Sequence, residues 1–345
     1  MKTSRFLAIF FRRLSYLLKN NLPLHSALET LKKDMQLNAP FAKVIGELKL
    51  KVEEGKSFSL ACANFPTYFS SFSLKIITLG EKVGKLDDVL LKYASFLEKR
   101  AIFHKKLLSL LIYPFLVVIV FLGSILFFIN IVFPQIELLF EDMGGDLPYL
   151  TLLVMKVLSF FNGYGFMILL FILILSILLL KYGYLPTRKI VIDKLILKIP
   201  IVKELVLKGD LLNFCSALCL SIQSGCRFLE GFSLAKNLVK NSYLAALLNE
   251  VEDKAQAGKP IKSLLKETHL LPFFFSSLLG SALKDGEVED SLNHLIETYE
   301  KELELELDMI IKFIEPLLII ILGMAVGIIV ISVLLPILDL SKQVA

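Results

Sequence analysis

The chain has 345 residues, 55% of them hydrophobic, and a mean hydropathy of +0.69. Soluble domains are usually about 45–50% apolar, so this composition excludes an ordinary soluble protein and indicates a membrane protein with soluble parts. The formal net charge of +5 comes with no RNA- or DNA-reading motif, and the basic residues crowd beside apolar runs, so we expect no nucleic-acid binding.

The first 106 residues predict a cytoplasmic helical bundle. The start resembles a signal peptide, but its apolar core at residues 6–11 is too short and is followed by Arg12 and Arg13, which favours an amphipathic helix. Helical periodicity then continues, with breaks at glycine, proline and asparagine positions. We expect about six short helices, the first ending at Asn21, because asparagine tolerates the left-handed conformation of a helix cap.

An apolar run at residues 107–134 predicts the first transmembrane helix. Pro114 and Pro134 are 20 residues apart, which corresponds to roughly 30 Å of helix, the hydrocarbon thickness of a bilayer. The short connection that follows, residues 135–157, carries four acidic residues and one lysine, whereas basic residues flank the apolar runs on either side of it. The positive-inside rule therefore places this connection outside the cytoplasm and the N-terminal region inside.

The rest of the chain divides into four predicted segments: a second transmembrane helix at 158–181, a cytoplasmic segment with a second bundle at 182–312, a third transmembrane helix at 313–338, and an extracytoplasmic tail at 339–345. Pro316 and Pro336 are again 20 residues apart. We expect Pro316 in the first turn of the third transmembrane helix, where its missing N–H costs nothing, and Pro336 at the end of that helix.

The chain contains an internal repeat. The proline pairs of the first and third apolar runs are offset by 202 residues. Similar offsets relate other pairs: Asn21 and Gly225, Gly55 and Gly258, Gly84 and Gly286, and Pro66 and Pro272. A repeat of this length predicts two copies of one structural unit. The alternating stretch ELELELDM at 302–309 is expected to be helical, because Glu and Leu both favour helix. The predicted fold is therefore an all-α membrane protein with two homologous cytoplasmic bundles of about six helices each and three transmembrane helices.

The order of motifs resembles the GspF/PilC platform proteins of type II secretion, type IV pilus and DNA-uptake machines. The matching pieces are LLKNNLPLHSALE at 17–29, LGEKVGKLDDVL with Gly80, Glu81, Gly84 and Leu86, the start of the first span at Tyr113 and Pro114, DLPYLT with Pro148 and Thr151, Glu315 with Pro316, and LLPILDL with Pro336. The resemblance covers nearly the whole chain. The second copy departs from the pattern, because Gly286 is followed by Glu287 and no Gly-Glu pair precedes it.

The resemblance implies a non-enzymatic platform in the bacterial inner membrane, with no cofactor. Its expected partners are a cytoplasmic hexameric assembly ATPase acting on the bundles, pilin or pseudopilin subunits received from the bilayer, other inner-membrane assembly components, membrane lipid and further copies of the chain. The chain starts almost directly with the first copy, which favours a short, competence-like or reduced system. The alternatives are a membrane transporter, a membrane enzyme or an unrelated membrane scaffold.

Two features of the third apolar run are candidate sites. Glu315 lies near its cytoplasmic end. Its carboxylate extends to the interface beside a helix N-terminus, meets the positively charged N-terminus of an incoming pilin, or fixes the span against its neighbour. Gly323 and Gly327 form a GxxxG pattern, which either brings two helix backbones close together or is plain lipid-compatible sequence.

Two further candidates lie in the bundles. Gly80, Glu81 and Gly84 predict a helix–turn–helix junction or a contact surface for the ATPase; they lack the spacing of a phosphate-binding loop. The acidic run at 297–308 is either a solvated helix face or a docking surface for a basic partner. The four histidines are scattered and the four cysteines lack metal-ligand spacing, so we expect buried, reduced cysteines and no metal or catalytic site.

Overall fold

The computed structural model describes residues 2–34, 39–110, 112–132, 134, 135, 138, 149, 152–154, 156 and 186–344. The chain forms two compact units, one of residues 1–106 and 190–304 and the other of residues 107–189 and 305–345. The described residues contain no strand, which confirms the predicted all-α class.

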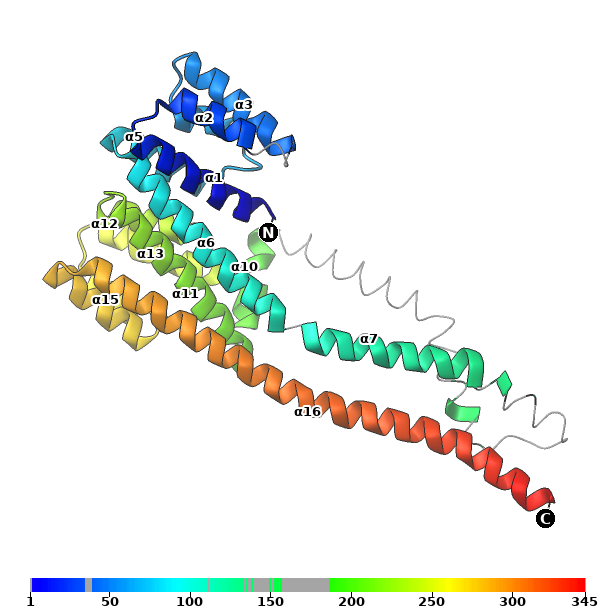
Figure 1. Ribbon diagram of the computed structural model, residues 1–345. Coiled ribbons are helices and arrows are strands. Elements are labelled where there is room, and N and C mark those ends of the chain that lie inside the picture. Colours follow the sequence, from blue (N-terminus) through cyan, green and yellow to red (C-terminus); the bar gives the residue numbers. More distant parts are fainter. Residues whose placement is uncertain are drawn as a thin grey trace. The chain divides into compact units, whose positions relative to one another are not determined.

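The first unit contains the two predicted bundles, each with six helices (Figure 1). The first bundle comprises α1 (Lys2–Lys19), α2 (Leu24–Asp34), α3 (Ala39–Glu53), α4 (Phe58–Ala63), α5 (Ser71–Val83) and α6 (Leu86–Leu110). The second bundle comprises α11 (Pro200–Gln223), α12 (Phe228–Lys236), α13 (Ser242–Gln256), α14 (Ile261–Glu267), α15 (Phe273–Asp285) and the first part of α16 (Val288–Val344). A further helix, α10 (Pro186–Ile196), precedes the second bundle.

The backbone confirms the repeat. Among the described residues, positive φ angles occur at six positions that form three pairs: Asn21 (60°) with Gly225 (96°), Gly55 (84°) with Gly258 (90°), and Gly84 (69°) with Gly286 (80°). Each pair ends equivalent helices of the two bundles. Only glycine, and less often asparagine, adopts this left-handed conformation readily, which is why these residues mark the turns.

One pairing from the sequence was wrong. Pro66 lies inside the connection between α4 and α5, whereas Pro272 is the N-cap residue of α15. Both α5 and α15 have 13 residues and end at equivalent glycines, so the residue equivalent to Pro272 is Ser70, the N-cap residue of α5. The connection in the second bundle is two residues shorter, and the similar letters FPTYFSS and LPFFFSS concealed this difference.

Aromatic side chains fill the interiors of both bundles. In the first, the rings of Phe11 and Tyr93 have centroids 5.1 Å apart; in the second, Phe214 and Phe232 are also 5.1 Å apart. Tilted and edge-to-face ring pairs of this kind add to the stabilisation that burial gives. The first pair joins α1 to α6, and the second joins α11 to α12.

The four cysteines are buried and unpaired, as the sequence predicted. Burial raises the pKa of the Cys219 thiol to about 11, with nearby Glu289 adding to the shift. Burial likewise raises the pKa of Cys226 to about 11, with Glu230 adding to it. The cysteines therefore remain protonated at neutral pH and pack as small apolar side chains.

Among the described residues, three helices are long and apolar enough to cross a membrane: the segment Ile112–Val132, α11 from Val202, and α16 up to Ser332. The first consists of α7 (Ile112–Phe127) and the π-helical turn η1 (Phe128–Val132). The most apolar stretches of the first and third are 0% and 6% buried, whereas that of α11 is 61% buried. We therefore assign α11 to the core of the second bundle. The predicted second span, 158–181, lies outside the described residues.

The predicted positions of two prolines in the third span were wrong. α16 runs without interruption for 57 residues, so Pro316 is inside the helix rather than in its first turn, and Pro336 does not end it. Each proline removes one backbone hydrogen bond, yet the helix continues for another two turns beyond Pro336. Helices in lipid tolerate prolines because neighbouring helices, side chains, water and local adjustments of the helix satisfy the backbone groups that a proline frees.

Candidate functional site

Glu81 holds the beginning of α4. Its carboxylate accepts the backbone N–H of Phe58 at 2.5 Å and of Ser59 at 3.2 Å, and the hydroxyl of Ser59 at 2.5 Å. A carboxylate at this position satisfies N–H groups that have no partner within the helix and interacts favourably with the positive end of the helix dipole. Ser57, the N-cap residue, supplies a further acceptor to Leu60.

The glycines beside Glu81 shape the junction between α5 and α6. A Cβ atom on Gly80 would lie 3.1 Å from Cβ of Val89 and 3.2 Å from Cα of Leu86, so only glycine fits between the two helices without movement. Gly84 ends α5 in the left-handed conformation. The four residues of the motif thus build a helix–turn–helix junction, with Leu86 opening α6, while Gly84 itself is exposed on the surface.

The second bundle places its carboxylates elsewhere. Leu283 occupies the position of Glu81, and α14 begins at Pro260 without a side-chain cap. Instead, buried Asp210 accepts the backbone N–H groups of Lys240 at 3.0 Å and Asn241 at 2.7 Å, just before α13. Burial raises the pKa of Asp210, although the two N–H groups oppose this shift.

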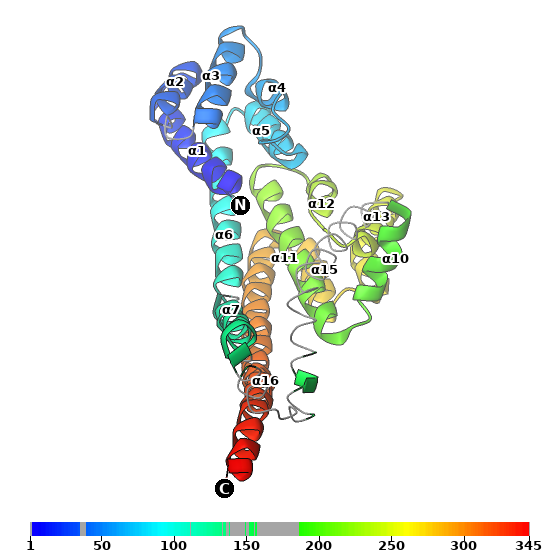
Figure 2. The same ribbon diagram turned by 90° about the vertical axis from the view of Figure 1, so that its right-hand side faces the viewer.

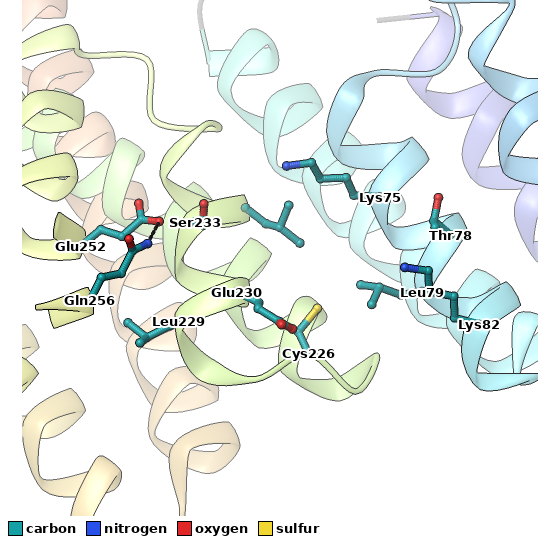
Figure 3. Close-up of a pocket in the computed structure, with 11 residues that line it drawn as sticks. Lys75, Thr78, Leu79, Lys82, Cys226, Leu229, Glu230, Ser233, Glu252 and Gln256 are labelled. Atoms are coloured by element: carbon teal, nitrogen blue, oxygen red, sulfur yellow. Dashed lines mark hydrogen bonds between the residues drawn. The ribbon is translucent and has the colours of Figure 1, made fainter. Parts of the chain in front are cut away.

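A groove of about 500 Å³ lies between the bundles (Figure 3). One wall is a face of α5 with Lys75, Thr78 and Lys82; the other is formed by α12 and α13 and carries Glu230 and Glu252. Volumes of several hundred Å³ are typical of binding sites. The groove therefore separates a basic wall on one bundle from an acidic wall on the other.

The buried carboxylate of this acidic wall is already paired. Glu252 forms an ion pair with Lys236 and accepts a hydrogen bond from Gln256 at 3.1 Å. The ammonium groups of Lys75 and Lys82 are on exposed residues of α5. Charge in the groove is therefore more available on the basic wall than on the acidic one.

Polar contacts connect the bundles outside the groove. Lys92 of α6 donates to the carbonyl oxygen of Gln223, at the end of α11, at 2.8 Å. A cation beside the last carbonyl of a helix interacts favourably with the helix dipole. Further along α6, Lys106 pairs with Glu304 of α16 at 2.6 Å.

The acidic run of α16 has partners within the molecule. Besides the Glu304 pair, Glu302 binds Lys208 of α11 at 2.8 Å, and Tyr299 and Leu303 are buried in the core. Burial raises the pKa of Glu300, while Lys99 opposes the shift. One side of this run therefore packs inside the bundle through Tyr299 and Leu303, whereas Glu297 and Asp308 are exposed, so a solvated face and a docking surface both remain open for the other side.

The second unit carries the remaining sequence candidates. Glu315 and Tyr113 are exposed, and nothing lies within 4 Å of a Cβ built on Gly323 or Gly327. Pro114 is in the first turn of α7, and Pro134 follows η1. Pro148 and Thr151 lie outside the described residues. Gly55, Gly258 and Gly286 are exposed turn residues of the bundles.

Sequence reasoning missed Asp210 and Lys92. One signal for Asp210 was available: it is a lone acid within the apolar sequence LVLKGDLLNFC, where a charge needs a partner. Lys92 had no such signal, because lysines are common on the surface of a helix. Within the described part of the chain, no group of three or more His, Cys, Asp or Glu side chains is placed to hold a metal ion.

Comparison with known proteins finds the same duplication. The family described as "Type II secretion system (T2SS), protein F" matches residues 10–134 and, separately, residues 214–336. The two matches correspond to the two bundles with the apolar helices that follow them. They support the repeat independently of the backbone angles.

Individual relatives align along almost the whole chain. A type IV pilus assembly protein PilC from Thermus thermophilus is 30% identical over 331 residues, which are 96% of this chain and 81% of the relative. A type II secretion system protein F from Aeromonas hydrophila is 26% identical over 98% of this chain and 87% of its own length. A PilC protein from Myxococcus xanthus is 27% identical over 97% of this chain and 80% of its own. The chain therefore belongs to the type II secretion system protein F family of helical membrane proteins.

Proposed function

We propose that this protein is the inner-membrane platform of a type II secretion, type IV pilus or competence machine. It couples a cytoplasmic assembly ATPase to the insertion of pilin-like subunits into a growing fibre. The role requires no catalysis by the platform itself. Family membership supports the class of machine, and relatives named for type II secretion and for type IV pilus assembly are both similar along the chain.

The single observation that carries the proposal is the length of α16. Its 57 residues correspond to about 85 Å of continuous helix. One end packs in the second bundle and the other is an exposed apolar helix. We infer that this continuous helix passes a force on the bundle along its axis to the apolar segment.

The contacts between the bundles indicate where such a force could displace one bundle against the other. They make polar contacts through Lys92 and Lys106, while the groove separates α5 from α12 and α13. We infer that the ATPase displaces one bundle against the other about these contacts. The exposed junction at Gly84 is a candidate contact point on the first bundle.

The membrane topology is part of the proposal. Both bundles are placed in the cytoplasm, the connection 135–157 and the tail 339–345 outside it. The charge asymmetry of the flanking segments supports this placement. In this arrangement Glu315 lies near the cytoplasmic interface, where its exposed carboxylate is available to the N-terminus of a pilin. The open face at Gly323 and Gly327 is available to another helix, from a pilin or a second copy.

The partners can be identified by co-purification. The tagged protein is extracted from its native cells in mild detergent, and the bound proteins are identified by mass spectrometry. Recovery of a hexameric assembly ATPase together with a pilin-like subunit is expected. Recovery of neither, with self-association intact and crosslinking controls working, would contradict the platform proposal and favour a transporter or an unrelated scaffold.

The coupling itself can be tested in α16. Insertion of four glycines after Met309 makes the helix flexible, whereas insertion of four alanines shifts its register equally but keeps it helical. We expect the glycine variant to retain the ATPase in co-purification but to assemble far fewer fibres than the alanine variant. Equal fibre assembly by the two variants would show that stiffness of α16 is not needed.

A further inference from the structure

Helix α10 packs on the second bundle through one side. The carboxylate of Asp193 accepts the backbone N–H of Ser242 at 2.6 Å, and its backbone carbonyl accepts the side-chain amide of Asn241 at 3.2 Å. Leu197, just after the helix, is 8% exposed. These contacts fix α10 against the start of α13.

The other side of α10 is apolar and exposed. Ile192 and Leu195 have the i, i+3 spacing of one helix face and are 42% and 54% exposed, and Ile199, in the short connection between α10 and α11, is 53% exposed. A helix that is apolar on both sides is expected to be covered on both. The second bundle covers only one of them.

The charges beside this stripe are basic. Lys194 and Lys198 are exposed, and the ammonium of Lys194 lies 5.2 Å from the ring centre of Tyr243. Asp193 is the one acid in α10, and its carboxylate is turned toward α13. The next acid, Glu204, forms an ion pair with Lys208 at 3.6 Å. The exposed aliphatic side chains of α10 are therefore followed by the exposed Lys198 in the next turn, while the Lys194 ammonium lies against α13.

The position of α10 along the chain connects it with the membrane. It begins at Pro186, five residues after the span predicted at 158–181. The sequence adds Arg188 and Lys189 to its first turn.

The helices that follow agree with this position. α11 runs antiparallel to α16, since Cys219 lies at Asn293 and Lys208 at Glu302. The start of α11 therefore lies beside the part of α16 that leaves the first unit and continues as the apolar segment.

We propose that α10 lies in the headgroup region of an anionic phospholipid bilayer and holds the second bundle on the membrane surface. Interfacial helices bury aliphatic side chains roughly 5–10 Å into the headgroup and acyl boundary while their cations meet anionic lipids. Lysines near such a surface are attracted to its anionic lipids. Charge complementarity and the continuity of the chain with its membrane spans favour lipid over a protein partner.

The absence of tryptophan from the sequence permits a direct test. The full-length Leu195→Trp variant is placed in bilayers of mixed anionic and zwitterionic phospholipid, with or without bromine on the upper acyl carbons. The brominated lipid is expected to remove most of the tryptophan emission, and acrylamide in the water very little. Ile192→Trp, on the same stripe, repeats the measurement in case Leu195→Trp misfolds.

A matched control uses Leu50→Trp on α3, since Leu50 is 58% exposed on the first bundle. Its emission is expected to respond to acrylamide and not to brominated lipid. Adding Lys194→Gln and Lys198→Gln to Leu195→Trp should restore emission in brominated bilayers. Quenching of Leu195→Trp by acrylamide alone would overturn the proposal. Blue-shifted emission insensitive to both quenchers would also overturn it, because a protein partner or second copy would then cover the stripe.

Discussion

The two bundles have the same backbone plan but different charges. Residues 1–106 contain 19 Lys and Arg against 9 Asp and Glu, a formal charge of +10, whereas residues 190–304 contain 13 against 16, a charge of −3. The six helices and the three left-handed turns are nevertheless shared. Figure 2 shows the bundles of the first unit from a second direction. The difference in net charge between the bundles shows that the same helix order and turn geometry are compatible with a basic and with an acidic bundle.

The buried and half-buried carboxylates differ in the same way. The first bundle uses Glu81 to hold the beginning of α4, and its equivalent in the second is Leu283. The second uses Asp210 to hold the beginning of α13, and the equivalent residue in the first is Phe6. Each bundle therefore stabilises a different internal helix end with a carboxylate, and substitutions at these positions test how independent the bundles are.

Loss of Asp210 is expected to have the largest effect. Asp210→Ala leaves the N–H groups of Lys240 and Asn241 without an acceptor in a buried site. Leaving a buried polar group unsatisfied costs about 1–3 kcal/mol, so two such groups cost roughly 2–6 kcal/mol. Hydrogen–deuterium exchange of the full chain in detergent should become faster at the start of α13 and remain unchanged in α4. Equal acceleration in both bundles would show that they unfold together.

The same residue gives a pH dependence with a defined sign. Burial raises the pKa of Asp210 in the folded protein above its usual value. A group of this kind contributes stability that is complete below the unfolded pKa, about 3.9, and is lost as pH rises through the folded pKa. The stability difference between the wild type and Asp210→Ala should therefore be larger at acidic than at neutral pH. A difference that grows as pH rises would contradict this.

A methyl group at Gly80 is expected to have the next largest effect. Gly80→Ala drives a Cβ against Val89 and Leu86, and overpacking of this kind costs about 1–3 kcal/mol. The equivalent residue in the second bundle, Ala282, is 3% exposed and already accommodates its methyl group. The reciprocal Ala282→Gly should cost only about 1 kcal/mol, through helix propensity and a small cavity. Thermal unfolding in detergent, followed by circular dichroism, compares the two; equal losses would refute the packing argument.

Local turn chemistry made much of this fold predictable from the sequence. Asn21, Gly84 and Gly225 identify helix ends because few residues adopt a positive φ without strain. Helical periodicity likewise predicted six helices per bundle. Both signals are readable from the sequence because each depends only on residues a few positions apart.

Features that depend on distant or environmental context were not predictable. Pro316 and Pro336 lie within α16, although the same residues usually interrupt helices in water. The pairing of Pro66 with Pro272 failed because similar letters fall on connections of different length. Asp210 caps a segment 30 residues away in sequence, a contact that only the fold creates.

Exchanging the residues at the Glu81 position should have a smaller and reciprocal effect. Glu81→Leu removes the acceptor of the N–H groups of Phe58 and Ser59, and loss of a cap typically costs about 1 kcal/mol. Leu283→Glu offers an acceptor to α14, whose N-cap Pro260 has no side-chain hydrogen bond. Hydrogen–deuterium exchange should become faster in α4 for the first variant and slower in α14 for the second. Loss of protection in α14 on Leu283→Glu would show that this leucine packs rather than faces the helix end.

The smallest expected effects concern the ion pairs of the acidic run in α16. The side chains of Lys106 and Glu304 are 50% and 36% exposed, and exposed pairs contribute only about 0–1 kcal/mol. The side chain of Lys208 is 16% exposed, so Lys208→Ala should cost more, about 1 kcal/mol, because its aliphatic part also packs.

The dependence on salt concentration distinguishes the contribution of the ion pair from that of side-chain packing. At high ionic strength the small loss from Lys106→Ala should vanish, since screening already weakens the pair in the wild type. The loss from Lys208→Ala should persist, because packing is not screened. The measurement is the melting temperature of both variants in detergent at low and high salt. If the two losses respond equally to salt, Lys208 acts as a surface charge, and the acidic run of α16 is a solvated face rather than the internal packing surface that joins it to α11.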